Sequence, residues 1–184
     1  MLREAVLNKK TRVRGEWGTL SMRDLKTEAE AFRNFVEIVG GACPGRTFYR
    51  KQLLSAFHLA FSQNACNFSV PGAGKTSVVY AAYSYLASLP TDDPKSVDRL
   101  LIVGPLSSFK AWEDEFLSIF ERKPSARRIS GGVAKRERMD HLRGIAVASR
   151  SIELTLTTYQ TLANMEEEFR TFLKRVAPRA MVVL

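Results

Sequence analysis

Short apolar runs alternate with segments of helical periodicity along most of this sequence. The run RLLIVG (99–104) shows little polar alternation, which is typical of a strand covered on both faces. Strands that alternate with helices predict an α/β fold with a doubly wound, mainly parallel sheet. The expected strands are CNFSV (66–70), RLLIVG, a short run near 127–129, IELTLTT (152–158) and AMVVL (180–184). The expected helices lie in 21–39, 51–63, 75–88, 105–120, 159–177 and the segment after the run near 127–129.

The N-terminal part of the chain does not follow this alternation. Residues 1–20 are polar and basic and show no clear periodicity. Helical spacing over residues 21–39 leads to Gly40-Gly41, which predicts the end of that helix. We therefore expect residues 1–45 to form a basic arm with a helical extension, and residues 46–184 to form the α/β domain.

The charge of the chain favours polyanionic partners. It carries 28 Lys and Arg against 19 Asp and Glu, a net charge of +9 over 184 residues. Nucleic acid is the favoured partner, although charge alone also allows acidic membrane surfaces. No run approaches the roughly 18 apolar residues of a membrane span, and the N-terminus lacks the apolar core of a secretory signal.

Cysteine and histidine are too sparse for several kinds of site. Cys43 and Cys66 form no C-x-x-C pair, and Cys66 is expected in the core of the first strand. Two histidines give little material for a zinc site or a Ser-His-Asp triad. We expect a cytoplasmic protein with reduced thiols, nucleoid-associated if bacterial, that does not act at a membrane.

The segment SVPGAGKT (69–76) lies between the first apolar run and a helical pattern that begins at Lys75. A phosphate-binding loop has the pattern G-x-x-x-x-G-K-[ST] after a strand, and here the first position is Ser69. Glycines let backbone N–H groups at a helix N-terminus approach a β-phosphate closely. The Lys75 ammonium would bridge β- and γ-phosphate oxygens, and the Thr76 hydroxyl would bind Mg²⁺. An ordinary glycine-rich turn is the alternative. The candidate nucleotide-binding residues are Pro71, Gly72, Ala73, Gly74, Lys75, Thr76 and Ser77, with Lys75 and Thr76 in the catalytic role.

Three blocks of the sequence resemble motifs of superfamily 2 helicases. SVPGAGKT is similar to their motif I, A-x-x-G-x-G-K-T. LLIVGPLSSFKAWEDEF (100–116) resembles motif Ia of the Swi/Snf-type DNA translocases, and LTLTTYQTL (154–162) resembles their Ib region. FYRKQ (48–52) lies where that family has its adenine-reading segment, and Gln52 is either such a reader or an ordinary surface residue of a helix.

This resemblance implies the first RecA-like lobe of a P-loop ATPase that couples ATP hydrolysis to movement on nucleic acid, with double-stranded DNA favoured. It implies that Pro105, Ser107 and Ser108 open a helix toward a DNA phosphate, and that Thr157 and Thr158 offer hydroxyls to the DNA backbone. Ligands of parallel sheets sit beyond the carboxyl ends of the strands, which agrees with this placement. The residues alone also allow the serines to be helix caps and the threonines to be strand formers.

In that family an acidic D-E-x-H block follows a strand of the MVVL type, and a second lobe closes the ATP cleft. The sequence ends at Leu184, where the acidic block would begin, so we expect an incomplete ATP-binding lobe. Such a chain should bind ATP and Mg²⁺ but hydrolyse ATP poorly, because phosphoryl transfer needs positioning and charge stabilisation by all these parts. The missing second lobe is its expected protein partner.

Two other functions stay open. A small-molecule kinase could use the same loop, but it would need neither the 100–116 and 154–162 blocks nor the net charge of +9. A non-catalytic nucleic-acid-binding module with a vestigial ATP site is the other. The basic stretch from Arg122 to Arg143 either follows a phosphate backbone or is a solvated helix and loop.

Overall fold

The computed structural model describes residues 22–62, 64–147, 152–176 and 179–184. These residues form two compact units. The first contains the described residues up to Cys43 together with Thr47–Tyr85, and the second contains Pro44–Arg46 and Leu86–Leu184. The basic arm predicted for residues 1–20 lies outside the described residues.

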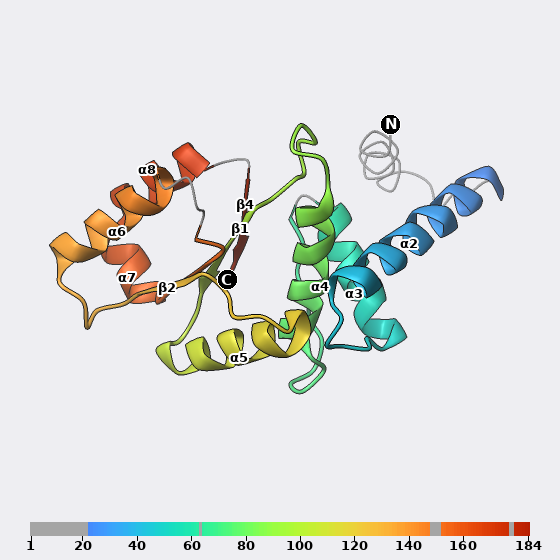
Figure 1. The fold of residues 1–184 in the computed structure, drawn as a ribbon, viewed down its shortest axis with the longest axis horizontal. Helices are drawn as coiled ribbons and strands as arrows, with labels where there is room; N and C mark the ends of the chain where they lie inside the picture. The colour runs from blue at the N-terminus through green and yellow to red at the C-terminus, as the bar shows by residue number, and fades with distance from the viewer. Residues whose placement is uncertain (1–21, 63, 148–151, 177–178) are drawn as a thin grey trace. The chain divides into compact units, whose positions relative to one another are not determined.

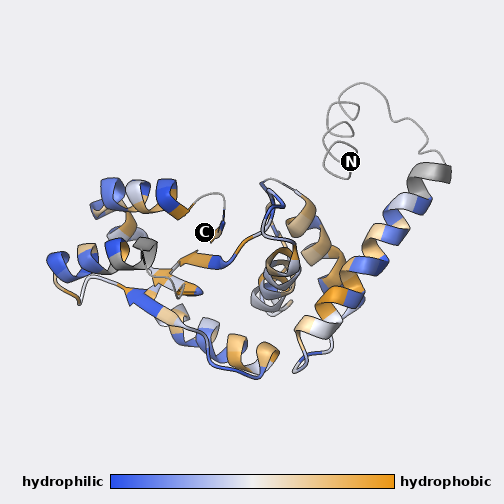
Figure 2. Cartoon of the chain, turned by 45° about the horizontal axis from the view of Figure 1, so that its top comes forward, coloured by the Kyte–Doolittle hydropathy of each residue, from blue (hydrophilic) through white to orange (hydrophobic). Residues whose placement is uncertain are grey.

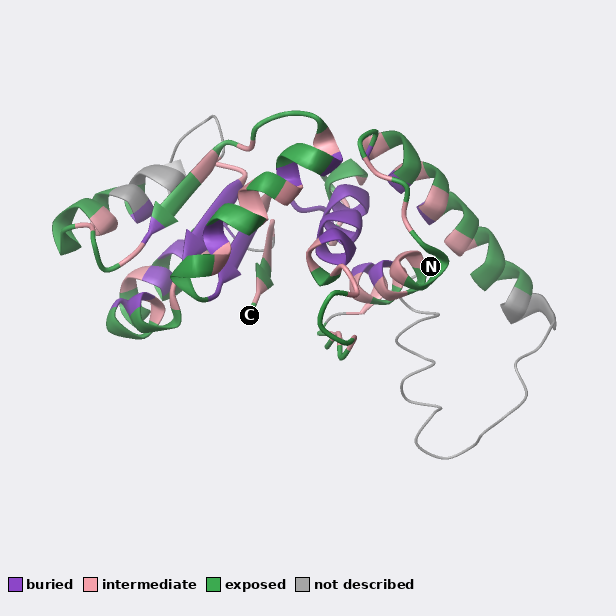
Figure 3. Ribbon diagram, turned by 90° about the horizontal axis from the view of Figure 1, so that it is seen from below, coloured by how far each residue is buried: buried purple, intermediate pink, exposed green. Residues whose placement is uncertain are grey.

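Three helices build the first unit. They are α2 (Met22–Ala42), α3 (Arg50–Phe61) and α4 (Lys75–Ser88). Aromatic rings join them: Phe35 lies 5.4 Å from Phe57 and 5.1 Å from Tyr85 between ring centroids, and Phe61 lies 5.3 Å from Tyr85. Such pairs add to the burial of large apolar surfaces. Helix α4 is apolar on nearly all sides and is largely buried, as Figure 3 shows.

Helix α2 does not end at Gly40-Gly41, so that prediction is wrong. The helix runs through both glycines to Ala42, and the Cys43 N–H still bonds to the Val39 carbonyl at 3.0 Å. Glycine inside a helix costs only about 1 kcal/mol relative to alanine. The full burial of Phe35 and Val39 on the preceding turns offsets that cost.

Residues 65–70 do not form the predicted strand. Cys66 is exposed, and the side chains of Phe68 and Val70 are 92% and 71% exposed, so the expectation of a core Cys66 is also wrong. The Asn67 side-chain oxygen accepts the Ser69 N–H at 3.0 Å and the Ser69 hydroxyl, which closes a local turn. Such side-chain bonds compete with strand pairing, and β-propensity is effective only when a neighbouring strand is present.

A four-stranded parallel sheet is the centre of the second unit. Its order is β2-β3-β1-β4, and all three neighbouring pairs are parallel, which confirms the predicted α/β class and parallel sheet. The central strands are buried, whereas the edge strands are partly exposed (Figure 3). The strands are β1 (Arg99–Val103), β2 (Ala126–Ile129), β3 (Leu154–Thr157) and β4 (Ala180–Val183).

Helices cover both faces of this sheet (Figure 1). On one face Leu101, Val103 and Ile129 pack against residues of α6 and α8, among them Leu142 and Phe169. On the other face the strand neighbour of Ile129, Arg128, bonds to Glu113 of α5. The helical elements are η1 (Leu106–Ser108), α5 (Phe109–Phe120), α6 (Lys135–Val147), α7 (Tyr159–Asn164) and α8 (Glu166–Val176). Within the described ranges, no helix has the length and apolar character needed to cross a membrane.

The single helix predicted over 159–177 is two helices, α7 and α8, which separate at Met165. Met165 is buried in the core and takes a non-helical conformation. Three glutamates, Glu166–Glu168, occupy the first turn of α8, where the positive end of the helix dipole stabilises them. The acidic run therefore favours a new helix start over continuation of α7.

Candidate functional site

The phosphate-loop segment folds as a tight turn at the start of α4. Gly72 and Gly74 have φ angles of +81° and +77°, in the left-handed region that other residues rarely adopt. The Ala73 N–H bonds to the Val70 carbonyl at 3.2 Å, and Val78 N–H bonds to the Gly74 carbonyl at 3.0 Å. The latter bond starts the helical ladder, so the backbone amides that precede it lie at the positive end of α4. That is the local geometry of an anion-binding helix N-terminus.

The side chains of the loop differ in their access to solvent. Lys75 is exposed, Thr76 is half-buried and Ser77 is buried. An exposed ammonium at the first residue of α4 is free to move toward a phosphate in front of the helix. In the part of the chain that the structure describes, no three His, Cys, Asp or Glu side chains gather as a metal-binding group. Mg²⁺ at this loop would therefore rest on the Thr76 hydroxyl and on the oxygens of a bound nucleotide.

Gln52 lies directly against this loop. Its side-chain Nε2 donates to the Ala73 carbonyl at 3.1 Å, and its Oε1 accepts the Tyr49 N–H at 3.0 Å. The approach is so close that a Cβ added to Gly74 would lie 2.3 Å from the Gln52 Nε2. The structure thus brings together Gln52 and the loop, which the sequence placed in separate motifs. The amide of Gln52 links the N-terminus of α3 to the backbone of the loop, and adenine reading by Gln52 stays a prediction.

The predicted nucleic-acid residues belong to the second unit, at the carboxyl ends of two adjacent strands. Strands β1 and β3 pair in parallel, and the Gly104 N–H bonds to the Thr157 carbonyl at 3.0 Å just beyond them. Pro105 and Ser107 are exposed after β1. The side chain of Ser108 donates to the Pro105 carbonyl at 2.7 Å and makes no cap bond to α5. Pro105 and Ser107 are therefore open to a ligand, whereas Ser108 stabilises the turn.

The two threonines at the end of β3 have different positions. Thr158 caps α7, because its Oγ1 accepts the Thr161 N–H at 3.2 Å. Thr157 is fully buried, and its hydroxyl has no hydrogen-bond partner among the described residues. The expectation that Thr157 presents its hydroxyl to DNA is therefore not met, because β3 is a central strand whose four residues are all buried.

Sequence reasoning missed two exposed apolar side chains at the same strand ends. Leu106 follows β1 and is 60% exposed, and Tyr159 follows β3 and is 50% exposed. Their positions directly after predicted strands were the available signal, because ligand contacts in parallel sheets come from such residues. An aromatic ring at this edge is suited to stacking on a sugar or base.

No protein-family model matches this sequence, and no curated protein is significantly similar to it. The function is therefore inferred from the geometry of the two regions and from the motif resemblance.

Proposed function

We propose that this chain binds ATP and Mg²⁺ at the Pro71–Thr76 loop and is the RecA-like ATP-binding lobe of a superfamily 2 DNA translocase. The observation that supports this most directly is the pair of left-handed glycines ahead of α4. They let the backbone turn its amides toward one point, next to which Lys75 provides a mobile positive charge. A glycine-rich turn without a ligand would not need a lysine and a threonine as the first two helical residues.

The translocase assignment is supported by a different part of the chain. It depends on the resemblance of the 100–116 and 154–162 segments to motifs Ia and Ib, and on the strand ends that these segments form. Pro105, Ser107 and Thr158 lie at adjacent strand ends in the second unit, where a nucleic-acid backbone would meet the exposed Ser107 hydroxyl. The Thr158 hydroxyl is already bonded to Thr161, so its contribution is to hold the start of α7. We include no role for Thr157, because its hydroxyl is buried.

Nucleotide binding is tested by titration calorimetry of the full chain with ATP and Mg²⁺. Hydrogen bonds to a charged group contribute about 1.5–3 kcal/mol, so Lys75→Ala should raise the Kd for ATP by about 10- to 150-fold. Lys110→Ala is the matched control, because Lys110 is an exposed helical lysine on α5 that bonds to Asp114. The proposal fails if the unmodified chain binds no nucleotide, or if both variants bind ATP equally well.

The DNA assignment has a separate test. Ser107→Glu places a negative charge at the exposed strand end, and a like charge at a phosphate contact costs several kcal/mol, so binding to double-stranded DNA should weaken by at least about 10-fold. Ser118→Glu, at an exposed position near the other end of α5, is the control. Equal DNA binding by the two variants would remove the strand ends from the interface and would leave nucleotide binding intact.

A further inference from the structure

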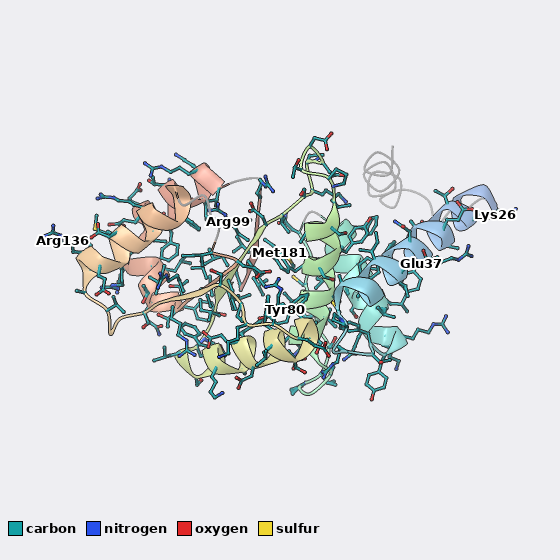
Figure 4. All side chains as sticks on the ribbon, viewed as in Figure 1. Lys26, Glu37, Tyr80, Arg99, Arg136 and Met181 are labelled. Carbon is teal, nitrogen blue, oxygen red and sulfur yellow. The ribbon has the colours of Figure 1, made fainter. Side chains whose placement is uncertain are left out.

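Strand β2 and helix α6 share a concentration of positive charge. The segment 121–143 contains eight basic residues and only three acidic ones, which gives five of the nine excess charges of the chain. Five of the basic side chains are exposed and have no ion pair or hydrogen bond to any described residue. We call these five the β2–α6 basic surface; they are Lys123, Arg127, Lys135, Arg136 and Arg143. Figure 4 shows the Arg136 side chain extending away from α6.

Two neighbouring arginines do not belong to this surface, because carboxylates hold them. Arg122 makes a bidentate contact with Glu153, with both N–O distances 2.7 Å. Arg128 bonds to Glu113 on α5 across the other face of the sheet, and this hydrogen bond raises the pKa of Arg128. Carboxylates therefore neutralise two arginines of this segment. The five side chains of the β2–α6 basic surface have no carboxylate partner among the described residues.

The geometry places strand and helix cations on one side. Arg127 alternates with Arg128 along β2 and so points to the same side as Ile129, which packs against Leu142 of α6. Between strand and helix, Gly131 and Gly132 are exposed, and a Cβ added to either would meet nothing within 4 Å. The surface is thus open from the edge strand across the turn to the start of α6.

Local stability does not explain this arrangement. Lys135 and Arg136 occupy the first turn of α6, where the positive end of the helix dipole disfavours cations. Protection of an exposed sheet edge would explain Arg127 but not the cations of the helix. Two carboxylates, Glu137 and Asp140, share α6 with them and reduce the field without cancelling it.

We infer that the β2–α6 basic surface binds the phosphate backbone of double-stranded DNA, as a second contact apart from the strand ends after β1 and β3. This inference depends on the DNA-binding part of the proposed function. A phosphate backbone is an extended polyanion, and the five cations are spread over strand β2, the segment before it and helix α6. A membrane partner fits less well, because interfacial helices need exposed apolar side chains, and the residues of segment 121–143 whose exposure is described contribute none of the large exposed hydrophobics. Figure 2 shows the hydrophilic character of α6.

The test compares two fourfold variants of the full chain, each losing two lysines and two arginines. The surface variant is Lys123→Gln, Arg127→Gln, Lys135→Gln and Arg136→Gln. The control variant is Lys26→Gln, Arg33→Gln, Arg50→Gln and Lys51→Gln, which removes exposed cations from α2 and α3. Binding to a short labelled duplex of random sequence is followed by fluorescence anisotropy without nucleotide, and circular dichroism checks that both variants fold.

The decisive quantity is the slope of log K against log salt concentration. Each phosphate contact contributes about 0.9 to the magnitude of this slope. The slope of the surface variant should therefore be smaller in magnitude by about 3–4, and that of the control variant should change far less. Between about 50 and 200 mM salt, the unmodified chain should then lose about 100-fold more affinity than the surface variant.

Several results would overturn the inference. The first is an equal slope for the two variants, and the second is no duplex binding by the unmodified chain. The third is a surface variant that binds DNA normally but no longer binds vesicles of anionic lipid. The Kd for ATP is measured on the same samples. If the surface variant binds ATP normally and keeps its DNA slope, the basic surface is wrong and nucleotide binding stands. If the unmodified chain binds no ATP but the surface variant loses its DNA slope, the phosphate loop is wrong and the surface stands.

Discussion

Replacement of Gly74 by alanine should destabilise the chain through two separable costs. The first is conformational, because the φ angle of +77° costs a residue with a Cβ about 1–2 kcal/mol. The second is steric, because the new Cβ would lie 2.3 Å from Gln52 Nε2. The Gln52 side chain is flexible and would move, but it would then lose its bonds to the Ala73 carbonyl and the Tyr49 N–H. At about 0.5–1.5 kcal/mol for each bond, the second cost is about 1–3 kcal/mol.

Gly72→Ala provides the matched comparison. Its φ angle is +81°, so the conformational cost is nearly the same, but an added Cβ meets nothing within 4 Å. Both substitutions also stiffen the unfolded chain by the same amount, and this contribution cancels between them. Gly74→Ala should therefore cost about 1–3 kcal/mol more than Gly72→Ala, because only Gly74→Ala displaces Gln52.

The assay is urea unfolding followed by far-ultraviolet circular dichroism, with Gln52→Ala combined with each glycine variant. Gln52→Ala removes the group that Gly74→Ala displaces, so the two changes should be less than additive by about 1–3 kcal/mol. Gly72→Ala and Gln52→Ala should add within about 0.5 kcal/mol. Equal costs for the two glycine variants, or additivity in both pairs, would refute the reasoning.

Other expectations follow from single contacts. Gly45→Ala should lower the free energy of unfolding by about 1–3 kcal/mol, because its Cβ would lie 2.0 Å from the Ser118 carbonyl oxygen. Gly132→Ala should not lower it, because a Cβ there would lie in open space. Thermal melts of the two variants compare these effects. Burial raises the pKa of the Cys43 thiol, so the native state keeps this proton longer than the unfolded state. Stability should therefore fall above about pH 8.5, and urea titrations should find a flatter profile in Cys43→Ala. Thr158→Ala should cost about 0.5–2 kcal/mol through the lost cap of α7, and Thr158→Ser should recover most of it in the same unfolding assay.

The sheet of the second unit was largely predictable, because its central strands β1 and β3 lie in runs of apolar and β-branched residues that are buried in the structure. The segment 65–70 shows the limit of this reasoning. Its alternation of Cys66, Phe68 and Val70 matches a strand as well as any other run, yet the described structure gives it no strand pairing and a side-chain turn at Asn67 instead. Pairing is a tertiary property, so a local pattern cannot establish it.

The phosphate loop was predictable in part. Glycine at positions 72 and 74 indicated the left-handed turns that the structure contains, because backbone conformation there is a local property. The contact between Gln52 and Ala73 was not predictable from local pattern, since it depends on how α3 packs against α4 through Phe61 and Tyr85. The burial of Thr157 likewise depends on tertiary structure, because β3 lies between two other strands and all its residues are covered.

The position of Gln52 leads to a last prediction, which separates its two roles. If Gln52 orders the loop, Gln52→Ala leaves the Ala73 carbonyl without this bond. Part of the binding free energy of any nucleotide is then used to order the loop backbone. The Kd for ATP and for GTP should then rise by the same factor, about 2- to 10-fold for one lost hydrogen bond. If Gln52 instead reads adenine, ATP binding should weaken while GTP binding stays unchanged. Calorimetric titration of both nucleotides decides between these outcomes, and Gln52→Glu sharpens the result. Its carboxylate can still accept the Tyr49 N–H but cannot donate to Ala73, so under the ordering role it should resemble Gln52→Ala.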